Sequence, residues 1–302
     1  MKARSIILVT GSHRSGTTWV GKTLNRAPET TYLHEPFNRY MPLTEYTRFR
    51  ADHNYMHLTR LNSRPFEADL DRLLNGKFWR PAPPVTSVGS AVRWPRRWWL
   101  ANRPRRRGYH VILKDPMALL AAEYLAERYA AKPVVMIRHP AAFVASLVVK
   151  GWHFEFYHLA HQPHAVYSLF PEDADDVFRL AREPASLVEQ GAVLWRVLHR
   201  VIRRYREDHP NWHFVRHEDV SRDPIPEFRR MTDYAGLTWD DKIEQAVQQS
   251  TGAAFDPNAR GQVRDSKKNI TTWKQRLADD DIDAVRRTVG DVADAFYGAD
   301  DW

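Results

Sequence analysis

A short loop rich in glycine, serine and threonine follows the first apolar run of the sequence. Ser5–Thr10 predicts a buried strand, Gly11–Thr18 forms the loop, and an amphipathic helix is expected to begin near Gly16. The N-terminus of a helix presents free N–H groups and the positive end of the helix dipole, so this order favours binding of phosphate or sulfate. The loop is therefore predicted to be an anion-binding site.

Two registers of this loop compete. Gly16–Thr23 matches the nucleotide-binding pattern G-x-x-x-x-G-K-[ST], which would predict an ATPase or kinase that binds through Lys22. That pattern requires its first glycine directly after the strand and its lysine at the helix start, whereas Lys22 falls inside the expected helix. In the other register Gly11 follows the strand, and the cation is Arg14, whose planar guanidinium suits an oxyanion. The neighbouring neutral donors are Ser15, Thr17 and Thr18.

The hexamer Arg14–Trp19, RSGTTW, resembles the 5′-phosphosulfate loop of sulfotransferases that use 3′-phosphoadenosine-5′-phosphosulfate (PAPS). In that family a Lys or Arg precedes Ser-Gly-Thr-Thr or Ser-Gly-Thr-Ser. The resemblance implies that Arg14 and the loop bind the donor, with 3′-phosphoadenosine-5′-phosphate (PAP) as the product and no obligatory metal. The donor-binding residues that it implies here are Arg14, Ser15, Gly16, Thr17, Thr18 and Trp19.

Glu35 is the candidate general base. Thr30–Leu33 predicts a short strand that ends in His34-Glu35-Pro36, and Pro36 is expected to stop the strand and to hold Glu35 extended at its end. The carboxyl ends of parallel strands face the ligand crevice, where a carboxylate could deprotonate an acceptor hydroxyl. Glu-Pro also resembles carbohydrate-type sulfotransferases. His34 is the fallback base, and a Glu that only caps a turn is the alternative interpretation.

Lys114 ends the next predicted strand, Tyr109–Leu113, just before Asp115-Pro116 and a helix expected over Ala118–Ala130. Its ammonium could stabilise negative charge on the bridging oxygen as the S–O bond breaks. Lys-Asp-Pro resembles the tyrosyl-protein branch of the family; cytosolic members have Lys-Thr-His, with the His as base. Because this sequence lacks that His, the resemblance favours Glu35. A surface ion pair is the alternative for Lys114.

Arg138 and Ser146 are predicted to bind a second phosphate. Arg138 closes the predicted strand Pro133–Ile137, and Ser146 lies eight residues further along the following helix. This Arg-x7-Ser spacing resembles the 3′-phosphate site of the family. An NTPase strand would end more naturally in an acid that holds Mg²⁺, which Arg138 cannot do.

A polar loop near the C-terminus, Ala253–Thr272, contains further cations before Trp273-Lys274. Cytosolic sulfotransferases have Arg-Lys-Gly before a Trp-Lys pair, where the cations close over the 3′-phosphate. The match is partial, because Ser266 stands in place of that motif's arginine. The candidate contacts are Arg264, Lys267 and Lys268, and a solvated basic loop is the alternative.

The charge of the chain is unevenly placed. Seven of the 45 basic residues are arginines within Arg93–Arg107, and the remaining basic residues nearly balance the 37 acidic ones. That segment, where Trp94, Trp98 and Trp99 interleave with the arginines, is predicted to be a surface lid, a peripheral contact with an anionic membrane or glycolipid, or a nucleic-acid patch. Because the rest of the chain is nearly neutral, general binding of nucleic acid is not expected.

Four histidines (His153, His158, His161 and His164) suggest a metal site, but Pro163 interrupts any helix that would align them and no cysteine joins them. Trp152–Arg182 is therefore interpreted as a mobile lid or acceptor loop. Pro184–Tyr205 has a helical apolar stripe typical of core packing. Trp212–Val215 predicts a further strand, and Arg216–Asp219 after it is assigned a structural role.

The predicted fold is a single α/β domain over residues 1–302, with a P-loop-like, mainly parallel sheet and helices on both faces. Insertions at about 38–108 and 152–182 are expected to shape the acceptor site. With 43% hydrophobic residues, no cysteine and no apolar run near 18 residues, the chain is expected to be cytoplasmic, with peripheral membrane contact as the variant. The predicted activity is PAPS-dependent transfer to a hydroxyl of a carbohydrate, glycolipid or small metabolite; the rivals are an ATPase or kinase and a non-catalytic nucleic-acid or membrane binder. Oligomeric state is not predicted.

Overall fold

The computed structural model describes residues 5–40, 49–74, 109–251 and 270–302. Its centre is a sheet of five parallel strands in the order β2-β3-β1-β4-β5. The strands are β1 (Ser5–Gly11), β2 (Thr30–His34), β3 (His110–Lys114), β4 (Ala131–Ile137) and β5 (His213–Arg216). All five were predicted to within two residues at each end, because each is a short run of apolar and β-branched residues. The α/β prediction with a parallel sheet is confirmed.

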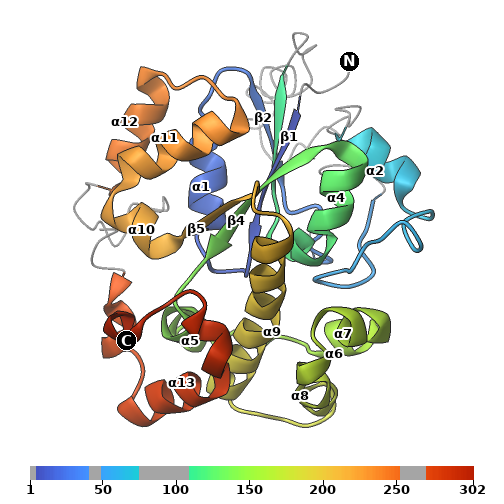
Figure 1. Ribbon diagram of the computed structural model, residues 1–302, viewed down its shortest axis with the longest axis vertical. Helices are drawn as coiled ribbons and strands as arrows, with labels where there is room; N and C mark the ends of the chain where they lie inside the picture. The colour runs from blue at the N-terminus through green and yellow to red at the C-terminus, as the bar shows by residue number, and fades with distance from the viewer. Residues whose placement is uncertain (1–4, 41–48, 75–108, 252–269) are drawn as a thin grey trace, which may run out of the picture.

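Helices cover both faces of the sheet (Figure 1). On one face α1 (Thr17–Leu24), α10 (His217–Arg222), α11 (Pro224–Ala235) and α12 (Asp241–Thr251) pack on a core that includes Ile7, Val9 and Ile112. On the other face the strand residues Ile6, Leu8 and Leu113 belong to a larger core. The longer helices that join this core are α2 (Glu67–Leu74), α4 (Ala122–Tyr129), α5 (Pro140–Val148), α9 (Leu187–Asp208) and α13 (Asp279–Asp294).

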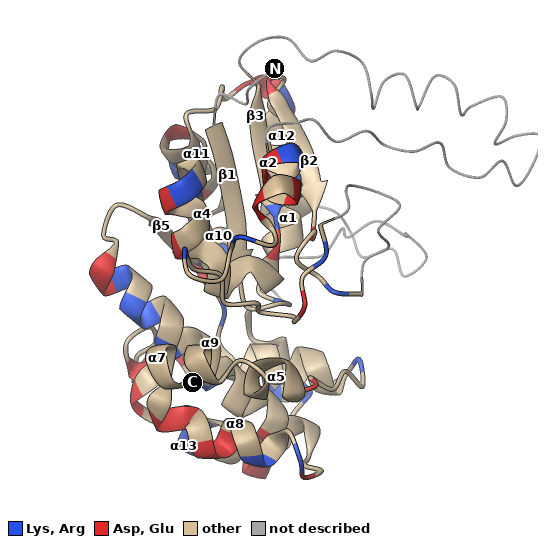
Figure 2. Cartoon of the chain, turned by 90° about the vertical axis from the view of Figure 1, so that its right-hand side faces the viewer, with Lys and Arg blue, Asp and Glu red and all other residues tan. Residues whose placement is uncertain are grey.

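The longest helix, α9, shows how the sequence fixes this core. Its N-terminus is capped by Ser186, whose hydroxyl accepts from the Glu189 N–H, and its apolar stripe is buried as predicted. On its outer side Arg196 pairs with Asp173, a carboxylate that is 1% exposed, and with Asp176. Figure 2 shows acidic and basic residues along α8 (Ala174–Leu180) and α13, at the end of the molecule away from the chain's N-terminus.

Two local predictions were wrong. Trp152–Arg182 is not a loop throughout, since it contains α6 (Tyr157–Ala160), α7 (Pro163–Leu169) and α8. Pro163 and Pro171 each begin a short helical turn there, a position where proline is favoured. The helix expected over Ala118–Ala130 is instead a 3-10 helix, Pro116–Ala121, followed by α4.

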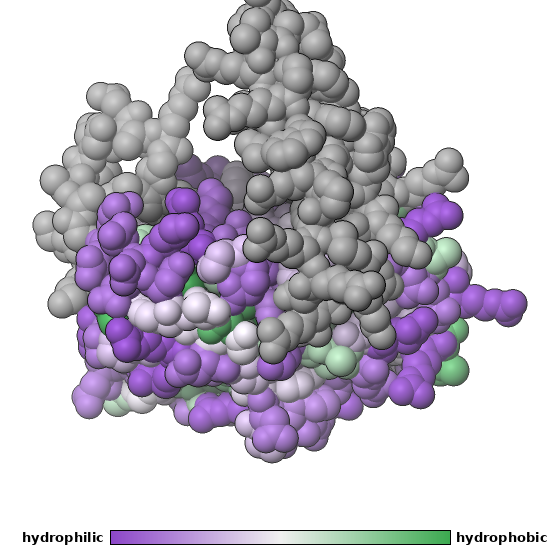
Figure 3. Space-filling model, turned by 90° about the horizontal axis from the view of Figure 1, so that it is seen from above, coloured by the Kyte–Doolittle hydropathy of each residue, from purple (hydrophilic) through white to green (hydrophobic). Residues whose placement is uncertain are grey.

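The surface of the described chain offers few apolar features. Seen from above, its visible side chains are mostly hydrophilic, with small hydrophobic patches between them (Figure 3). Within the described ranges, no helix has both the length and the apolar content needed to cross a bilayer. The Arg93–Arg107 segment lies outside the described residues, as do Arg264, Lys267 and Lys268.

Candidate active site

The loop after β1 has the geometry of an anion cradle. Gly11 and Gly16 hold φ angles of 136° and 95°, which glycine adopts without steric cost, and α1 begins at Thr17. A Cβ on Gly11 would lie 2.3 Å from the Met136 carbonyl oxygen, so the loop leaves the sheet tightly against β4. Thr17 is therefore at the start of α1, and the predicted register from Gly11 agrees with this geometry.

Lys22 is not part of the cradle loop, although it lines the cavity described below. It is the sixth residue of α1 and is exposed, so it is not at the helix start where the nucleotide-binding pattern would require it. The second glycine of that pattern has a packing reason, because a Cβ on Gly21 would come within 2.9 Å of the Lys114 side chain. The second glycine of the match Gly16–Thr23 is therefore explained by the close packing of α1 on β3.

A cavity of about 940 Å³ opens at the carboxyl ends of the strands. Its walls include most of the predicted site residues, together with residues that the sequence did not single out. The predicted residues that line it are Arg14, Gly16, Thr17, Thr18, Trp19, His34, Glu35 and Arg138. The other residues that matter below are His13, Asn38, Tyr40, Met117, Trp152, Phe154, His217 and Ser250. Ser15 does not line it; its hydroxyl donates to the Ser12 carbonyl at 2.6 Å and closes the loop.

The structure brings the two predicted anion sites together. Arg14 Nε donates to Ser146 Oγ at 2.9 Å, across 132 residues of sequence, and Arg138 donates to the Arg14 carbonyl oxygen. The Arg14 guanidinium also lies 5.0 Å from the Trp152 ring centroid. Arg14 and Arg138 therefore lie together on the cavity wall, and Ser146, which does not line the cavity, holds Arg14. The two guanidinium groups suit a ligand that carries several negative charges.

Glu35 and Lys114 form a buried ion pair. His34 pairs with Lys114 in the register of β2 and β3, so Glu35 comes directly after the end of that ladder. Lys114 donates to Glu35 Oε1, and Asn38 Nδ2 donates to Oε2 at 2.8 Å. The Lys114 side chain is 1% exposed and that of Glu35 17% exposed. Lys114 is therefore not a surface ion pair, although Glu35 rather than Lys114 faces the cavity.

The environment keeps Glu35 ionised. Burial acts to raise the pKa of Glu35, but the Lys114 charge and the hydrogen bonds from Lys114 and Asn38 outweigh it and hold that pKa below its usual value. The prediction that Pro36 holds Glu35 in an extended conformation was wrong: the backbone of Glu35 is left-handed, with φ of 50°. Its N–H donates to the Lys114 carbonyl at 2.8 Å, a tertiary contact that overrides the local preference.

Asp115 joins the segments after β2 and β3. Its buried carboxyl accepts from the Phe37 N–H at 2.5 Å and from the Met117 N–H at 2.9 Å. Burial, followed by the negative charge of Glu35, raises the pKa of Asp115 to about 8. Apart from the adjacency of Asp115 to Lys114, no pattern in the sequence predicts that Asp115 joins these two segments.

His217 was also missed as a site residue. It begins α10 directly after β5 and packs over the loop, where a Cβ on Gly16 would lie 2.6 Å from its ring. Its ring also lies 6.1 Å from that of Trp19, whose Nε1 donates to Ser250 Oγ at 2.8 Å. The sequence predicted only a structural role for Arg216–Asp219. The contact of α10 with the loop depends on the order of the strands in the sheet, which the sequence does not show.

The histidines of the second insertion do not gather as ligands. His158 is buried against Tyr40 and Glu155, and His161 stacks near His53. Among the residues that the structure describes, no group of three or more His, Cys, Asp or Glu is placed to hold a metal ion.

Comparison with known proteins identifies the family. Residues 6–241 match the model of the sulfotransferase family. No curated protein matches the sequence. Among solved structures, the sulfotransferase domain of the curacin biosynthetic pathway is similar at 15% sequence identity. The match covers 94% of this chain and 97% of that chain, with a TM-score of 0.47. The sulfotransferase domain of the Synechococcus PCC 7002 olefin synthase gives 15% identity, 99% of this chain, 97% of that chain and a TM-score of 0.49.

Mouse sulfotransferase SULT7A1, complexed with PAP, is similar at 12% identity over 94% of this chain and 83% of that chain, with a TM-score of 0.44. The family match covers the cradle loop, Glu35, Lys114, Arg138 and Ser146. Since it spans well over half of the sequence, the chain belongs to the sulfotransferase family and is a sulfotransferase.

Proposed function

We propose that the protein transfers the sulfuryl group of PAPS to a hydroxyl group of a carbohydrate, glycolipid or small metabolite. The observation that carries the proposal is that Arg14, Arg138 and Glu35 line one cavity. Ser146 is bonded to Arg14 and Lys114 to Glu35. A cavity of about 940 Å³ falls within the range of small-molecule sites. Its cationic side suits a nucleotide that carries phosphate at both ends.

In this proposal Arg14 and the N–H groups of the cradle bind the 5′-phosphosulfate, while Arg138 and Ser146 bind the 3′-phosphate. Trp19 lines the same side and offers a ring face to the adenine. Thr17 and Thr18 add hydroxyl and backbone donors at the start of α1. Arg264, Lys267 and Lys268 remain candidate contacts to the 3′-phosphate, and PAP is the product.

Glu35 is the proposed general base. The acceptor oxygen forms a new bond to sulfur as the bond from sulfur to the 5′-phosphate oxygen breaks, and the hydroxyl proton passes to the Glu35 carboxylate. Lys114 keeps that carboxylate ionised before transfer. Once Glu35 takes the proton, the Lys114 ammonium loses its counter-charge and its field stabilises the negative charge that develops on the departing nucleotide. Neither step requires a metal ion.

Nucleotide binding tests the donor. PAP at about 100 times its Kd should stabilise the protein by about 2.7 kcal/mol, and ADP and AMP should give much smaller shifts in Tm. The same comparison is made with Lys22→Ala. This variant should bind PAP like the wild type because Lys22, although it lines the cavity, is exposed and lies in the second turn of α1, away from the free N–H groups of the cradle. A preference for ADP that is lost in Lys22→Ala would show that the protein is an ATPase or kinase instead.

Glu35→Gln tests the base. The substitution preserves shape and removes the proton acceptor, so turnover should fall by about 10²–10⁴-fold while PAP affinity is retained. Activity within a few-fold of the wild type would remove Glu35 from that role, and His34, which also lines the cavity, would then be tested as the base.

Acceptor class and membrane contact depend on the insertions. Asn38, Tyr40 and Trp152 belong to these segments and line the cavity, which supports their proposed part in forming the acceptor site. For the Arg93–Arg107 segment we propose peripheral contact with anionic lipid, to be tested by the salt dependence of binding to vesicles that contain anionic lipid.

A further inference from the structure

His13 stands in the cradle loop directly before Arg14 and lines the cavity, but the proposed reaction gives it no part so far. Its ring is held among aromatic side chains, 5.2 Å from the Phe143 ring in an edge contact and 6.4 Å from that of Phe154 in a stacked one. The imidazole therefore has a fixed plane at the wall of the site.

Tyr55 determines which nitrogen of His13 carries the proton. The backbone N–H of His13 donates to Tyr55 Oη at 2.9 Å, and His13 Nδ1 lies 2.8 Å from the same oxygen. A backbone N–H can only donate, so Tyr55 Oη accepts that bond. Within the described ranges Tyr55 Oη has no hydrogen-bond partner besides His13, so the buried phenol proton is satisfied only if His13 Nδ1 accepts it, which places the imidazole proton on Nε2.

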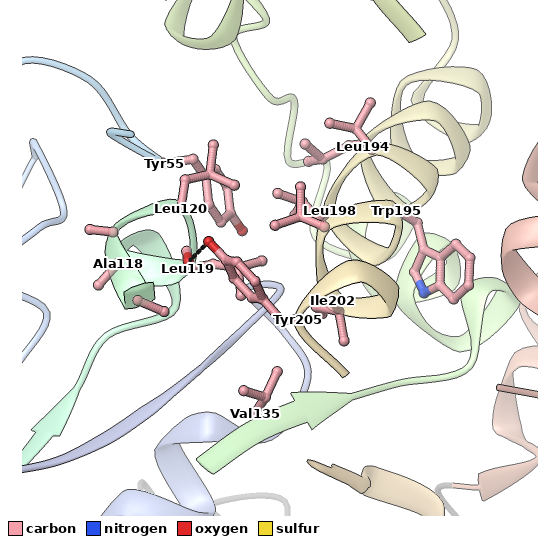
Figure 4. Close-up of a cluster of buried hydrophobic side chains, with 14 of the residues drawn as sticks. Tyr55, Ala118, Leu119, Leu120, Val135, Leu194, Trp195, Leu198, Ile202 and Tyr205 are labelled. Carbon is pink, nitrogen blue, oxygen red and sulfur yellow. Dashed lines mark hydrogen bonds between the residues drawn. The ribbon is translucent and has the colours of Figure 1, made fainter. Parts of the chain in front are cut away.

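Tyr55 is itself fixed. Its side chain is fully buried, and Figure 4 shows it beside Leu120 in the cluster of apolar side chains that also contains Leu198. Because this ring cannot turn without disturbing the core, the hydrogen bond to Nδ1 is preorganised. The ring edge of His13 that carries Nε2 is directed away from Tyr55.

The His13 imidazole is neutral at physiological pH. Burial, followed by the positive charge of Arg14, lowers its pKa to about 4, although Glu35 acts in the opposite direction. Nε2 forms no hydrogen bond to any residue in the described ranges. The imidazole of His13 is therefore hydrogen-bonded through Nδ1, while its Nε2–H group is left as a neutral donor. The charges of Arg14 and Glu35 both act on this ring.

We propose that His13 binds the transferring sulfuryl group, with Nε2–H donating to one of its oxygens, and that Tyr55 is the positioning residue that fixes this tautomer. The inference rests on the proposed function and adds a binding residue to it. The sulfuryl group must pass between the cation that holds the donor and the base that activates the acceptor, and His13 lines the same cavity as Arg14 and Glu35. A neutral donor suits that position, because it binds the group without adding a charge that would repel Arg14.

The first test is the tautomer. The ¹H–¹⁵N spectrum of the imidazole nitrogens at neutral pH should show His13 as the neutral Nε2–H form in the wild type. In Tyr55→Phe the ¹⁵N shift of Nδ1 should change, because the donor to Nδ1 is gone. A wild-type spectrum with the proton on Nδ1, or a spectrum that Tyr55→Phe leaves unchanged, would overturn the assignment. This readout does not depend on activity or on bound nucleotide.

The second test compares two amides at position 13. The amide nitrogen of a glutamine reaches the place of Nε2, whereas that of an asparagine reaches only the place of Nδ1. His13→Asn should weaken PAPS binding by about tenfold or more, the value of one hydrogen bond to a charged group. It should leave PAP binding within about twofold, because PAP has no sulfuryl group. His13→Gln should retain most of the PAPS affinity.

The outcomes separate the inference from the proposed function. If the wild type binds neither PAP nor PAPS, the proposed donor is wrong. If the wild type binds both and His13→Asn weakens both equally or neither, the donor stands and the sulfuryl contact of His13 is refuted.

Discussion

Replacing Asp115 by Asn should displace Glu35, the proposed base, without touching the substrate. Asp115 is fully buried and uses both carboxyl oxygens, one for the Phe37 N–H and one for the Met117 N–H. These two N–H groups belong to the segments that follow Glu35 and Lys114 in the sequence. Asp115→Asn keeps the shape of the side chain but turns one acceptor into a donor, which then faces one of the two N–H groups.

The size of the effect follows from that geometry. A buried donor left without a partner costs about 1–3 kcal/mol. The left-handed backbone of Glu35, with φ of 50°, costs a comparable amount, about 1–3 kcal/mol, and is held by this same contact and by the Lys114 carbonyl. The free energy of unfolding should therefore fall by about 1–3 kcal/mol. Turnover should fall by about tenfold or more as Glu35 leaves its position, since 1.4 kcal/mol corresponds to a factor of ten.

A double-mutant cycle with Glu35→Gln is the assay. If Asp115 acts through Glu35, Asp115→Asn should slow turnover in the wild type but add little in the Glu35→Gln background, where no base remains to be misplaced. PAP affinity should be unchanged in both, because the cradle loop does not depend on these contacts. An equal loss of turnover in both backgrounds would refute the reasoning and assign Asp115 to general stability.

The pH dependence of the unfolding free energy tests the burial of Asp115 independently of turnover. Burial and the charge of Glu35 raise the pKa of Asp115 from 3.8 to about 8, so the folded protein retains a proton that the unfolded chain releases. The associated stability is fully present below pH 3.8 and is lost as the pH rises towards about 8. Asp115→Asn has no such titration. The difference in unfolding free energy between wild type and variant should therefore shrink as pH rises in denaturant titrations, and a growing difference would contradict the assignment.

Two further variants test packing and electrostatics. Gly21→Ala places a methyl group 2.9 Å from the Lys114 side chain, so Tm should fall by an amount that corresponds to about 1–3 kcal/mol; Gly298→Ala, with nothing within 4 Å of its Cβ, is the control in the same thermal unfolding experiment. Equal Tm changes in both would contradict the packing argument. Asn38→Ala removes a hydrogen bond that lowers the pKa of Glu35, so that pKa should rise. The acidic limb of the kcat/KM profile should then move to higher pH; a limb that stays in place or moves to lower pH would contradict this role of Asn38.

The strands and the anion site could be predicted because each depends on local sequence. Short apolar runs predicted β1 to β5, and the rule that parallel strands end at one edge of the sheet placed Arg14, Glu35 and Arg138 on one cavity. The contact between Arg14 and Ser146 followed from no spacing in the sequence, since it depends on β4 lying beside β1.

The missed features depend on strand order and on short helices. His217 reaches the loop because β5 is the neighbour of β4, an order that composition does not encode. The helices of 157–180 were missed because none exceeds seven residues, too short for an apolar period to be recognised. His13 gave no sequence signal, because its tautomer depends on Tyr55, which is brought to it from another segment.

The backbone of the two central residues explains why local rules failed where the chemistry is proposed. Arg14 and Glu35 hold φ angles of 65° and 50°, a region that non-glycine residues rarely adopt. Each is held by a contact from a neighbouring strand end, the Arg14 carbonyl by Arg138 and the Glu35 N–H by the Lys114 carbonyl. Because such strain persists only when several contacts oppose its release, the side chains of Arg14 and Glu35 stay directed at the cavity before any ligand binds. The departure of Glu35 from the preference that Pro36 imposes is therefore itself an argument that its position is functional.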